Sequence, residues 1–427
     1  MQHIRLPLTS LKGVLVTAFL LLLLPLCEAQ VYSIKVLPTL NGLKGTPNTP
    51  TVIHGINKSG QVTGVSPSAN DGPHAFLWTP GTDIQDLGAG KYSQGTGVND
   101  LGHVAGLYIV PNDTWHAFLW TPVSGLQKLG LAGQYSQGTG LNNLDQVIGN
   151  LAAHAFRWNP ETSDMEDLGT LGGPYSFAYD INDSGQVVGF SQTDPELDQA
   201  PFLWSEATGM QQINGLAGSG GINEAGQVAG ETQIGHAALW TQAGGAQELG
   251  VLPGTAYSAA HAVNNRGVAV GNSWADRQLP GFVFIWSPAQ GMLNVNSLCK
   301  NKLHNWTAVG INDAGQIAIN KNGGVALILT PIIAVAMSSS QNPSHFGQSV
   351  TLTATTSSIT GPPPDGENIT FMDSSTVLGT APLVNGAATI TVSSLMVGTH
   401  LISASYPGDT NYAGKNSKVL RQTVVSP

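Results

Sequence analysis

The sequence contains little charge. Asp, Glu, Lys and Arg make up 10% of its 427 residues, against about 25% in typical soluble proteins. The 53 glycines and 25 prolines are typical of many short strands joined by turns. This composition argues against a mainly helical fold, and the length favours two or more domains.

Cysteine is almost absent as well. The chain has two cysteines, Cys27 and Cys299, and the first lies within an N-terminal targeting signal. Without Cys27 no intrachain disulfide can form. Stability must then come from packing and from the hydrogen bonds of the sheets.

The N-terminus has the layout of a signal peptide. Arg5 and Lys12 flank the start of an apolar run at residues 13–26 that is too short to span a bilayer comfortably, and Ala29 is a small residue before a cleavage point. We expect residues 1–29 to be removed near Ala29 and the protein to be secreted or held at the cell surface. Cys27 also allows a lipoprotein signal, but Leu26 stands where such signals carry a small residue.

The balance of charge limits the partners. Removal of Arg5, Lys12 and Glu28 from the 16 basic and 26 acidic residues leaves 14 and 25, a net charge of −11. Nucleic acid and anionic membranes are poor partners for such a surface. We expect a monomer without a membrane span in the mature chain.

One short element recurs along the chain. It has the form of INDSGQVVG at Ile181 and occurs seven times, about forty residues apart, which is typical of a repeat architecture. Its asparagines are Asn57, Asn99, Asn142, Asn182, Asn223, Asn264 and Asn312.

Two further elements follow each copy. The first is a tryptophan segment such as HAFLWTP at His74, replaced in the seventh copy by VALILTP at Val325. The second is a segment such as MEDLG at Met165, and the copy missing from the end of the array is supplied by SIKVLPTLNG at Ser33. With the run before each Asn, every repeat holds four short segments that read as strands.

Four strands in about forty residues is the period of a propeller blade. The chain begins with a fourth strand and its last repeat lacks one, so we predict an all-β fold in which residues 30–331 form a seven-bladed β-propeller. The N-terminal strand closes it by pairing with the segment from Val325 to Leu329, which removes an open edge. An open solenoid is the alternative.

The tail, residues 332–427, has a different pattern. Alternating runs such as SVTLTATT at Ser349 and HLISASY at His400 are separated by turn signals. They predict a β-sandwich of immunoglobulin (Ig) type without cysteines.

The motifs resemble two bacterial families. The tripeptide at His74, His116 and His154, with the following Trp and the INxxGQVVG element, resembles the HAF family of extracellular repeats over most of residues 50–331. The stretches SQNPSHFGQSVTLTA and SYPGDTNYAG resemble a bacterial Ig-like repeat. The resemblances imply a secreted or envelope protein of interaction type and no defined catalytic activity.

The repeated polar residues have structural interpretations. The Asn-x-x-Gly turns suit a β-hairpin better than a calcium loop, because Ser, Leu, Ala or Arg stands where a further oxygen ligand is needed. The histidines recur in different blades, too far apart to share one metal ion, and the tryptophans suit packing between blades. No common catalytic motif is present, and we expect neither a cofactor nor a metal.

Function is expected where the repeats differ. The connections between the second and third strands, and between the fourth strand and the next repeat, vary in length and share one face, and loops on a rigid scaffold commonly carry binding. The candidate ligand-binding residues in these loops are Trp115, Asp194, Glu196, Asp198, Trp274, Asp276, Arg277, Lys300 and His304. Solvated loops without a role are the alternative.

These observations lead to two functional hypotheses. The first is a secreted or surface-associated, non-enzymatic binding protein that presents its loop face to a glycan or a surface protein. The second is a secreted carbohydrate-active hydrolase or lyase that uses acidic residues of the same loops. Two carboxylates about 5 to 10 Å apart in one deep pocket would favour the enzyme.

Overall fold

The computed structural model describes residues 31–42, 50–69, 72–88, 91–109, 114–130, 133–193, 198–278, 281–299, 305–321 and 324–427. Within these residues the fold is all-β, and the one helical element is a short 3-10 turn, η1 (Val295–Leu298). The expected signal peptide, residues 1–29, lies outside the described residues.

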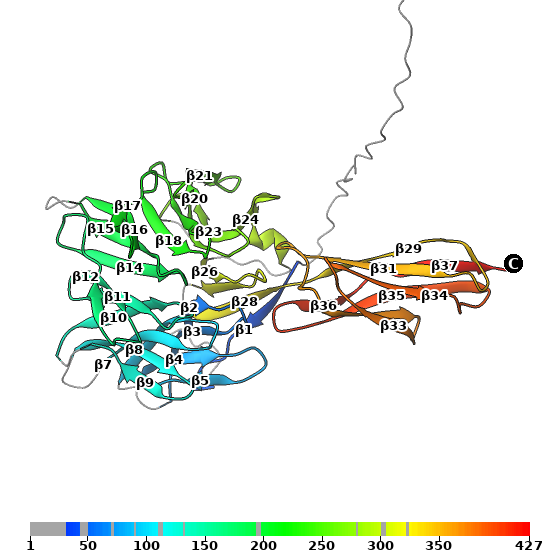
Figure 1. Cartoon of the computed structure of the whole chain (residues 1–427), viewed down its shortest axis with the longest axis horizontal. Helices are drawn as coiled ribbons and strands as arrows, with labels where there is room; N and C mark the ends of the chain where they lie inside the picture. Colours follow the sequence, from blue (N-terminus) through cyan, green and yellow to red (C-terminus); the bar gives the residue numbers. More distant parts are fainter. Residues whose placement is uncertain are drawn as a thin grey trace, which may run out of the picture.

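Residues 31–331 contain seven antiparallel sheets of four strands each, numbered sheets 1 to 7 in chain order (Figure 1). In sheets 1 to 6 the four strands are consecutive in sequence. Sheets 1 to 3 consist of β2 (Val52–Ile56), β3 (Val62–Pro67), β4 (Pro73–Trp78), β5 (Ile84–Asp86), β6 (Tyr92–Val98), β7 (Val104–Ile109), β8 (Trp115–Thr121), β9 (Gly125–Lys128), β10 (Ser136–Leu141), β11 (Val147–Leu151), β12 (His154–Trp158) and β13 (Met165–Asp167). Sheets 4 to 6 consist of β14 (Ser176–Ile181), β15 (Val187–Gln192), β16 (Gln199–Ser205), β17 (Gly209–Gln212), β18 (Gly218–Ile222), β19 (Val228–Glu231), β20 (Ala237–Thr241), β21 (Gly245–Gly250), β22 (Tyr257–Val263), β23 (Ala269–Trp274), β24 (Phe282–Ser287) and β25 (Gly291–Asn294).

Sheet 7 joins the two ends of this region. Its strands are β26 (Trp306–Ile311), β27 (Ile317–Lys321), β28 (Val325–Pro331) and β1 (Tyr32–Val36). β1 pairs antiparallel with β28, with Ile34 opposite Leu329. The predicted pairing of the N-terminal strand with the segment from Val325 is confirmed.

Each repeated Asn forms a hairpin between the first two strands of its sheet. The Oδ1 atom of Asn142 accepts hydrogen bonds from the backbone N–H groups of Leu144 and Gln146, at 3.1 and 3.0 Å. The residue three positions after the Asn has a positive φ, 75° at Gly185 and 59° at Asp145, a conformation that Gly and Asp tolerate. The hairpin interpretation is therefore confirmed.

The same asparagines link the sheets to one another. The Nδ2 atom of each donates to the backbone carbonyl of the Asn in the following sheet, over distances of 2.8 to 3.1 Å. The last bond runs from Asn312 back to the carbonyl of Asn57. The seven hairpins thus form a closed circle of hydrogen bonds, and the first strands of the sheets surround a common axis.

The tryptophan segments pack the sheets against their neighbours. Phe76, Phe118 and Phe156 are fully buried, and five of the six tryptophans are at most 8% exposed. The alanine between His and Phe is also buried, and its N–H donates to a serine on the first strand of the next sheet, as from Ala75 to Ser93 at 3.0 Å. Bulky side chains and this one bond together fix the contact between sheets.

The tail forms two sheets around one core. One sheet contains β29 (Ala334–Ser339), β31 (Val350–Ser357) and β34 (Ala387–Val392), and the other contains β30 (Ser344–His345), β32 (Asn368–Asp373), β33 (Thr376–Pro382), β35 (Gly398–Gly408), β36 (Ala413–Asn416) and β37 (Leu420–Val425). Phe371, Tyr406 and Tyr412 are among its buried core residues. This is the Ig-like unit expected from the sequence.

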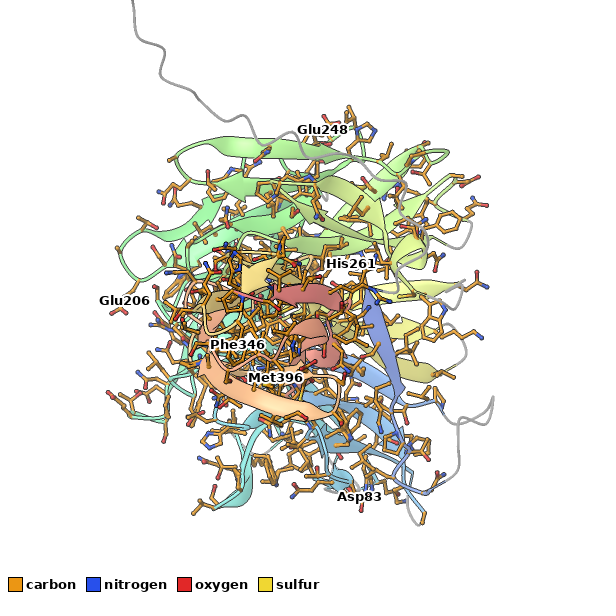
Figure 2. The ribbon with its side chains drawn as sticks, turned by 90° about the vertical axis from the view of Figure 1, so that its right-hand side faces the viewer. Asp83, Glu206, Glu248, His261, Phe346 and Met396 are labelled. Atoms are coloured by element: carbon orange, nitrogen blue, oxygen red, sulfur yellow. The ribbon has the colours of Figure 1, made fainter. Side chains whose placement is uncertain are left out.

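The Ig-like unit contacts the side of the seven sheets that carries the Asn hairpins, which we call the hairpin face. Arg266 Nη1 donates to the carbonyl of Thr360 at 2.7 Å, and Thr360 Oγ1 donates to the carbonyl of Ala314 at 2.8 Å. The unit projects away from the sheets, toward the right in Figure 1, and the sheets surround it in the end-on view of Figure 2. The connections that vary in length lie on the opposite side, the loop face.

The circle of asparagine bonds predicts a large effect of one substitution. Asn223→Ala removes the acceptor of two backbone N–H groups in its hairpin and the donor to Asn264. Because Asn223 is 4% exposed, we expect a loss of about 2 to 4 kcal/mol in the free energy of unfolding, measured by urea denaturation. Gln242→Ala, at an exposed amide, is the control, and equal stability of the two variants would contradict the assignment.

Candidate functional site

The hairpin face carries an acidic circle that the hairpins themselves use. The residue after each repeated Asn, except Lys58, has a side-chain oxygen that accepts the backbone N–H of the equivalent residue in the preceding sheet, as Asp100 does from Lys58 at 2.9 Å. These residues line a cavity of about 410 Å³. Burial, together with the charges of Asp183, Asp313 and Asp100, raises the pKa of Glu224. Among the described residues there is no cluster of three or more His, Cys, Asp or Glu side chains suited to hold a metal ion.

The repeated histidines bind within their own sheets. His74 Nδ1 lies 3.0 Å from Asp86 on the outermost strand, His154 lies 2.8 Å from Asp167, and His236 contacts Glu248 in the same way. Each therefore connects the third strand of a sheet to the fourth, as predicted for a structural role. The outermost strands lie far from the axis, as the labelled Glu248 shows at the edge of Figure 2.

The predicted loop residues fall into separate groups on the loop face. Trp115 begins β8 and meets Tyr92 edge-on, with ring centroids 5.3 Å apart. Trp274 ends β23, with its ring 6.5 Å from that of His261. Arg277 donates to Glu231 at 3.0 Å and lies 5.1 Å from the centre of the Tyr257 ring.

The predicted acidic and basic residues are less informative. Asp276 is exposed and its Oδ1 accepts the N–H of Gln278 in a turn, and Asp198 is an exposed residue whose backbone carbonyl accepts from Thr193. The remaining candidates lie outside the described residues: Asp194, Glu196, Lys300 and His304.

The loop face also carries tyrosines that are not among the binding residues predicted from the sequence. Four of the seven repeated asparagines are preceded, seven positions earlier, by a tyrosine at the start of the first strand; these rim tyrosines are Tyr92, Tyr135, Tyr175 and Tyr257. The last three are 36%, 47% and 37% exposed. The serine after each rim tyrosine is the one that binds the alanine N–H of the preceding sheet. The recurring Tyr-Ser pairs in the sequence could have indicated the rim tyrosines.

A second cavity, of about 340 Å³, lies on the axis between the loop face and the hairpins, and we call it the axial cavity. The first strand of every sheet has a β-bulge at the same position, and the bulged residues line this cavity. They are His54, Thr96, Thr139, Tyr179, Gly220, Gly221, His261 and Val309. Bulges often re-aim side chains beside functional sites, and here they direct the least uniform residues of the repeat to the axis, where Figure 2 shows His261.

The two histidines of the axial cavity are held neutral. Their Nδ1 atoms lie 3.0 and 2.8 Å from the backbone carbonyls of Gly95 and Ala308 in the next sheets. A carbonyl accepts only, so Nδ1 carries the proton and Nε2 is an acceptor. Burial lowers the pKa of His54 and of His261, which favours this neutral form.

Asp180 breaks the repeat beside the bulge of sheet 4. The equivalent positions in the other six sheets hold five glycines and one alanine: Gly55, Gly97, Gly140, Gly221, Ala262 and Gly310. Its Oδ2 accepts the N–H of Ile222 in sheet 5 at 2.9 Å, and its Oδ1 accepts that of Ile181 at 2.9 Å. Burial raises the pKa of the carboxyl to about 6, although these two hydrogen bonds act to lower it.

The chemistry that this arrangement supports is recognition. Asp180 is the one carboxylate among the described residues that line the axial cavity, so the cavity lacks the pair of acids that glycoside hydrolysis commonly uses. The loop face offers exposed aromatic rings and one cation, Arg277. Both features suit binding of a ligand with apolar faces and hydrogen-bond donors.

Comparison with solved structures finds distant likenesses. The chain is similar to the extracellular domain of a one component system from B. thetaiotaomicron, with 9% identity, coverage of 88% of this chain and 69% of that chain, and a TM-score of 0.28. It is also similar to a mutant of AofleA from Arthrobotrys oligospora, with 12% identity, coverage of 86% and 94%, and a TM-score of 0.26. A polysaccharide lyase shows 10% identity, coverage of 89% and 47%, and a TM-score of 0.18. At these TM-scores the likenesses indicate no function of the chain.

Two further findings concern the chain itself. No curated protein matches the sequence, and the described residues include no helix of the length and apolar character that a membrane crossing needs. In the family comparison, residues 337–425 match the model of a bacterial Ig-like domain (group 3).

Proposed function

We propose that residues 30–331 form a seven-bladed β-propeller of HAF type, closed by β1, and that residues 332–427 belong to the Ig-like unit. The closed circle of asparagine bonds and the pairing of β1 with β28 support this architecture. Each four-stranded sheet is then one blade, and the axial cavity is the central channel of the propeller.

The protein acts outside the cytoplasm in this proposal. The signal-peptide layout of residues 1–29 supports a secreted or surface-associated protein. The Ig-like unit serves as a spacer, because it holds the hairpin face and leaves the loop face free.

The proposed activity is non-enzymatic binding of a glycan at the loop face. The observation that carries it is the set of rim tyrosines, which come from four blades and present partly exposed rings around the axis. The C–H face of a pyranose ring packs on an aromatic ring, and the tyrosine hydroxyl adds a hydrogen bond. Tyrosines also lose little conformational entropy on binding, and Arg277 beside Tyr257 supplies donors for sugar oxygens.

A carbohydrate-active hydrolase or lyase is the second candidate. One observation favours it: a carboxyl whose pKa is raised to about 6, as that of Asp180 is, is suited to act as a general acid. A partner carboxylate is needed, and on the loop face Asp198 and Asp276 are described candidates.

The binding proposal predicts that rim tyrosines determine affinity. Glycan-array screening of the mature chain should yield ligands, and Tyr175→Ala and Tyr257→Ala should each weaken their binding about tenfold or more, because a central aromatic contact contributes about 1 to 3 kcal/mol. Phe346→Ala, at an exposed ring 47% accessible on the Ig-like unit (Figure 2), should leave binding unchanged. Retention of wild-type affinity by both tyrosine variants would rule out this site.

The same ligands separate binding from catalysis. We expect no new reducing ends or unsaturated products when array hits are incubated with the mature chain, measured by chromatography of the oligosaccharides over a day. Turnover that disappears in Asp198→Asn or Asp276→Asn, with binding retained, would instead establish the enzyme.

A further inference from the structure

The axial cavity holds a negative charge without a counter-ion. No Lys or Arg is among the described residues that line the axial cavity, and both of its histidines are neutral. The other charge that acts on the Asp180 carboxylate is that of Glu224, which is also negative. The two backbone bonds to Asp180 leave further lone pairs on its carboxylate. Asp180 is half-buried, and a carboxylate withdrawn from water is costly unless it is paired, so this position favours a bound cation.

The sheet next to Asp180 contributes only glycine backbone from its bulge to the lining of the axial cavity. Sheet 5 has Gly220 where the other sheets carry a bulged side chain, so no bulged side chain lies between those of sheets 4 and 6. A Cβ atom at Gly221 would lie 3.0 Å from Asp180 Oδ2 and 3.5 Å from the carbonyl oxygen of His261. Asp180 and the His261 backbone therefore both lie against the glycine backbone of sheet 5, at the wall of the axial cavity.

The groups at this wall of the axial cavity are mostly acceptors. His261 donates through Nδ1, and its Nε2 has no partner among the described residues. The Tyr179 ring also lines the cavity and is 46% exposed, and an aromatic face attracts a cation. A carboxylate, an imidazole nitrogen and an aromatic ring together suit a group that carries a positive charge and several N–H donors.

We propose that the axial cavity binds a small primary amine, with the ammonium group between Asp180 and His261 and the body of the amine in the rest of the cavity. The ammonium donates to Asp180 and to His261 Nε2, and the Tyr179 ring lies against its charge. A volume of about 340 Å³ suits a body about the size of one six-membered ring. The site suits a metal ion less well, because the described residues provide no cluster of three or more His, Cys, Asp or Glu side chains that could hold one. This site is independent of the glycan proposed for the loop face.

The test uses a probe that is not a sugar, so that loop-face binding cannot imitate it. Calorimetry of the mature chain at pH 7.5 should detect cyclohexylmethylamine, and should detect its uncharged analogue cyclohexylmethanol at least tenfold more weakly. Asp180→Asn should weaken amine binding at least tenfold while the asparagine oxygen still accepts the Ile222 N–H. Asp83→Asn, at an exposed acid outside the axial cavity, should bind as the wild type does, and thermal melting confirms that both variants fold.

The pH dependence provides a second readout. Because burial raises the pKa of Asp180 to about 6, its negative charge is present at pH 7.5 and largely lost at pH 5. Amine binding by the wild type should therefore weaken as the pH falls, whereas amine binding by Asp180→Asn should not. Equal binding of amine and alcohol, unchanged binding by Asp180→Asn, or tighter binding of Ca²⁺ than of the amine would each overturn the proposal. Failure of the glycan screen with amine binding intact would refute the loop-face function alone.

Discussion

The structure depends on one hydrogen bond, from the Nδ2 atom of each repeated Asn to the backbone carbonyl of the next. The Oδ1 atom of the same side chain caps its own hairpin, so a single residue type fixes both the turn and the distance to the neighbouring sheet. Seven copies of the bond close on themselves. The spacing of the first strands, and hence the width of the cavities on the axis, follows from this repeated contact.

The repeated Asn hairpins hold the sheets together in the same way, so residues at the loop face and at the bulges can differ from sheet to sheet. The Ser that binds the alanine N–H of the preceding sheet holds each rim tyrosine in place, and the bulge directs a different residue to the axis in each sheet. Arg266 is an informative departure on the hairpin face. It stands where other repeats have Ser, Ala or Leu, and it contacts Thr360 of the Ig-like unit, so the substitution reflects the docking of a second domain.

The sequence predicted the parts of the fold that local chemistry determines. Strand runs, hairpins, the pairing of β1 and the positive φ of Asp145 followed from periodicity and turn preferences. The candidate site was harder, because a bulge leaves no mark in a four-strand pattern and the neighbours of a side chain across sheets are separated by about forty residues. Asp180 was visible as an Asp among glycines, but its importance depends on Gly221 in the next sheet. The described loop residues share a face, but no hydrogen bond or ring contact joins one of them to another.

The pairing of β1 with β28 has a consequence for biogenesis. Ser33 and Thr330 are partners in one sheet although almost the whole N-terminal unit separates them in sequence. During synthesis the first strand must therefore wait, with one edge unpaired, until the last sheet has emerged. Such long-range closure is slow compared with hairpin formation, and an unpaired edge invites association with other chains. The chain thus passes through an open, adhesive state whose duration is set by the rate of synthesis.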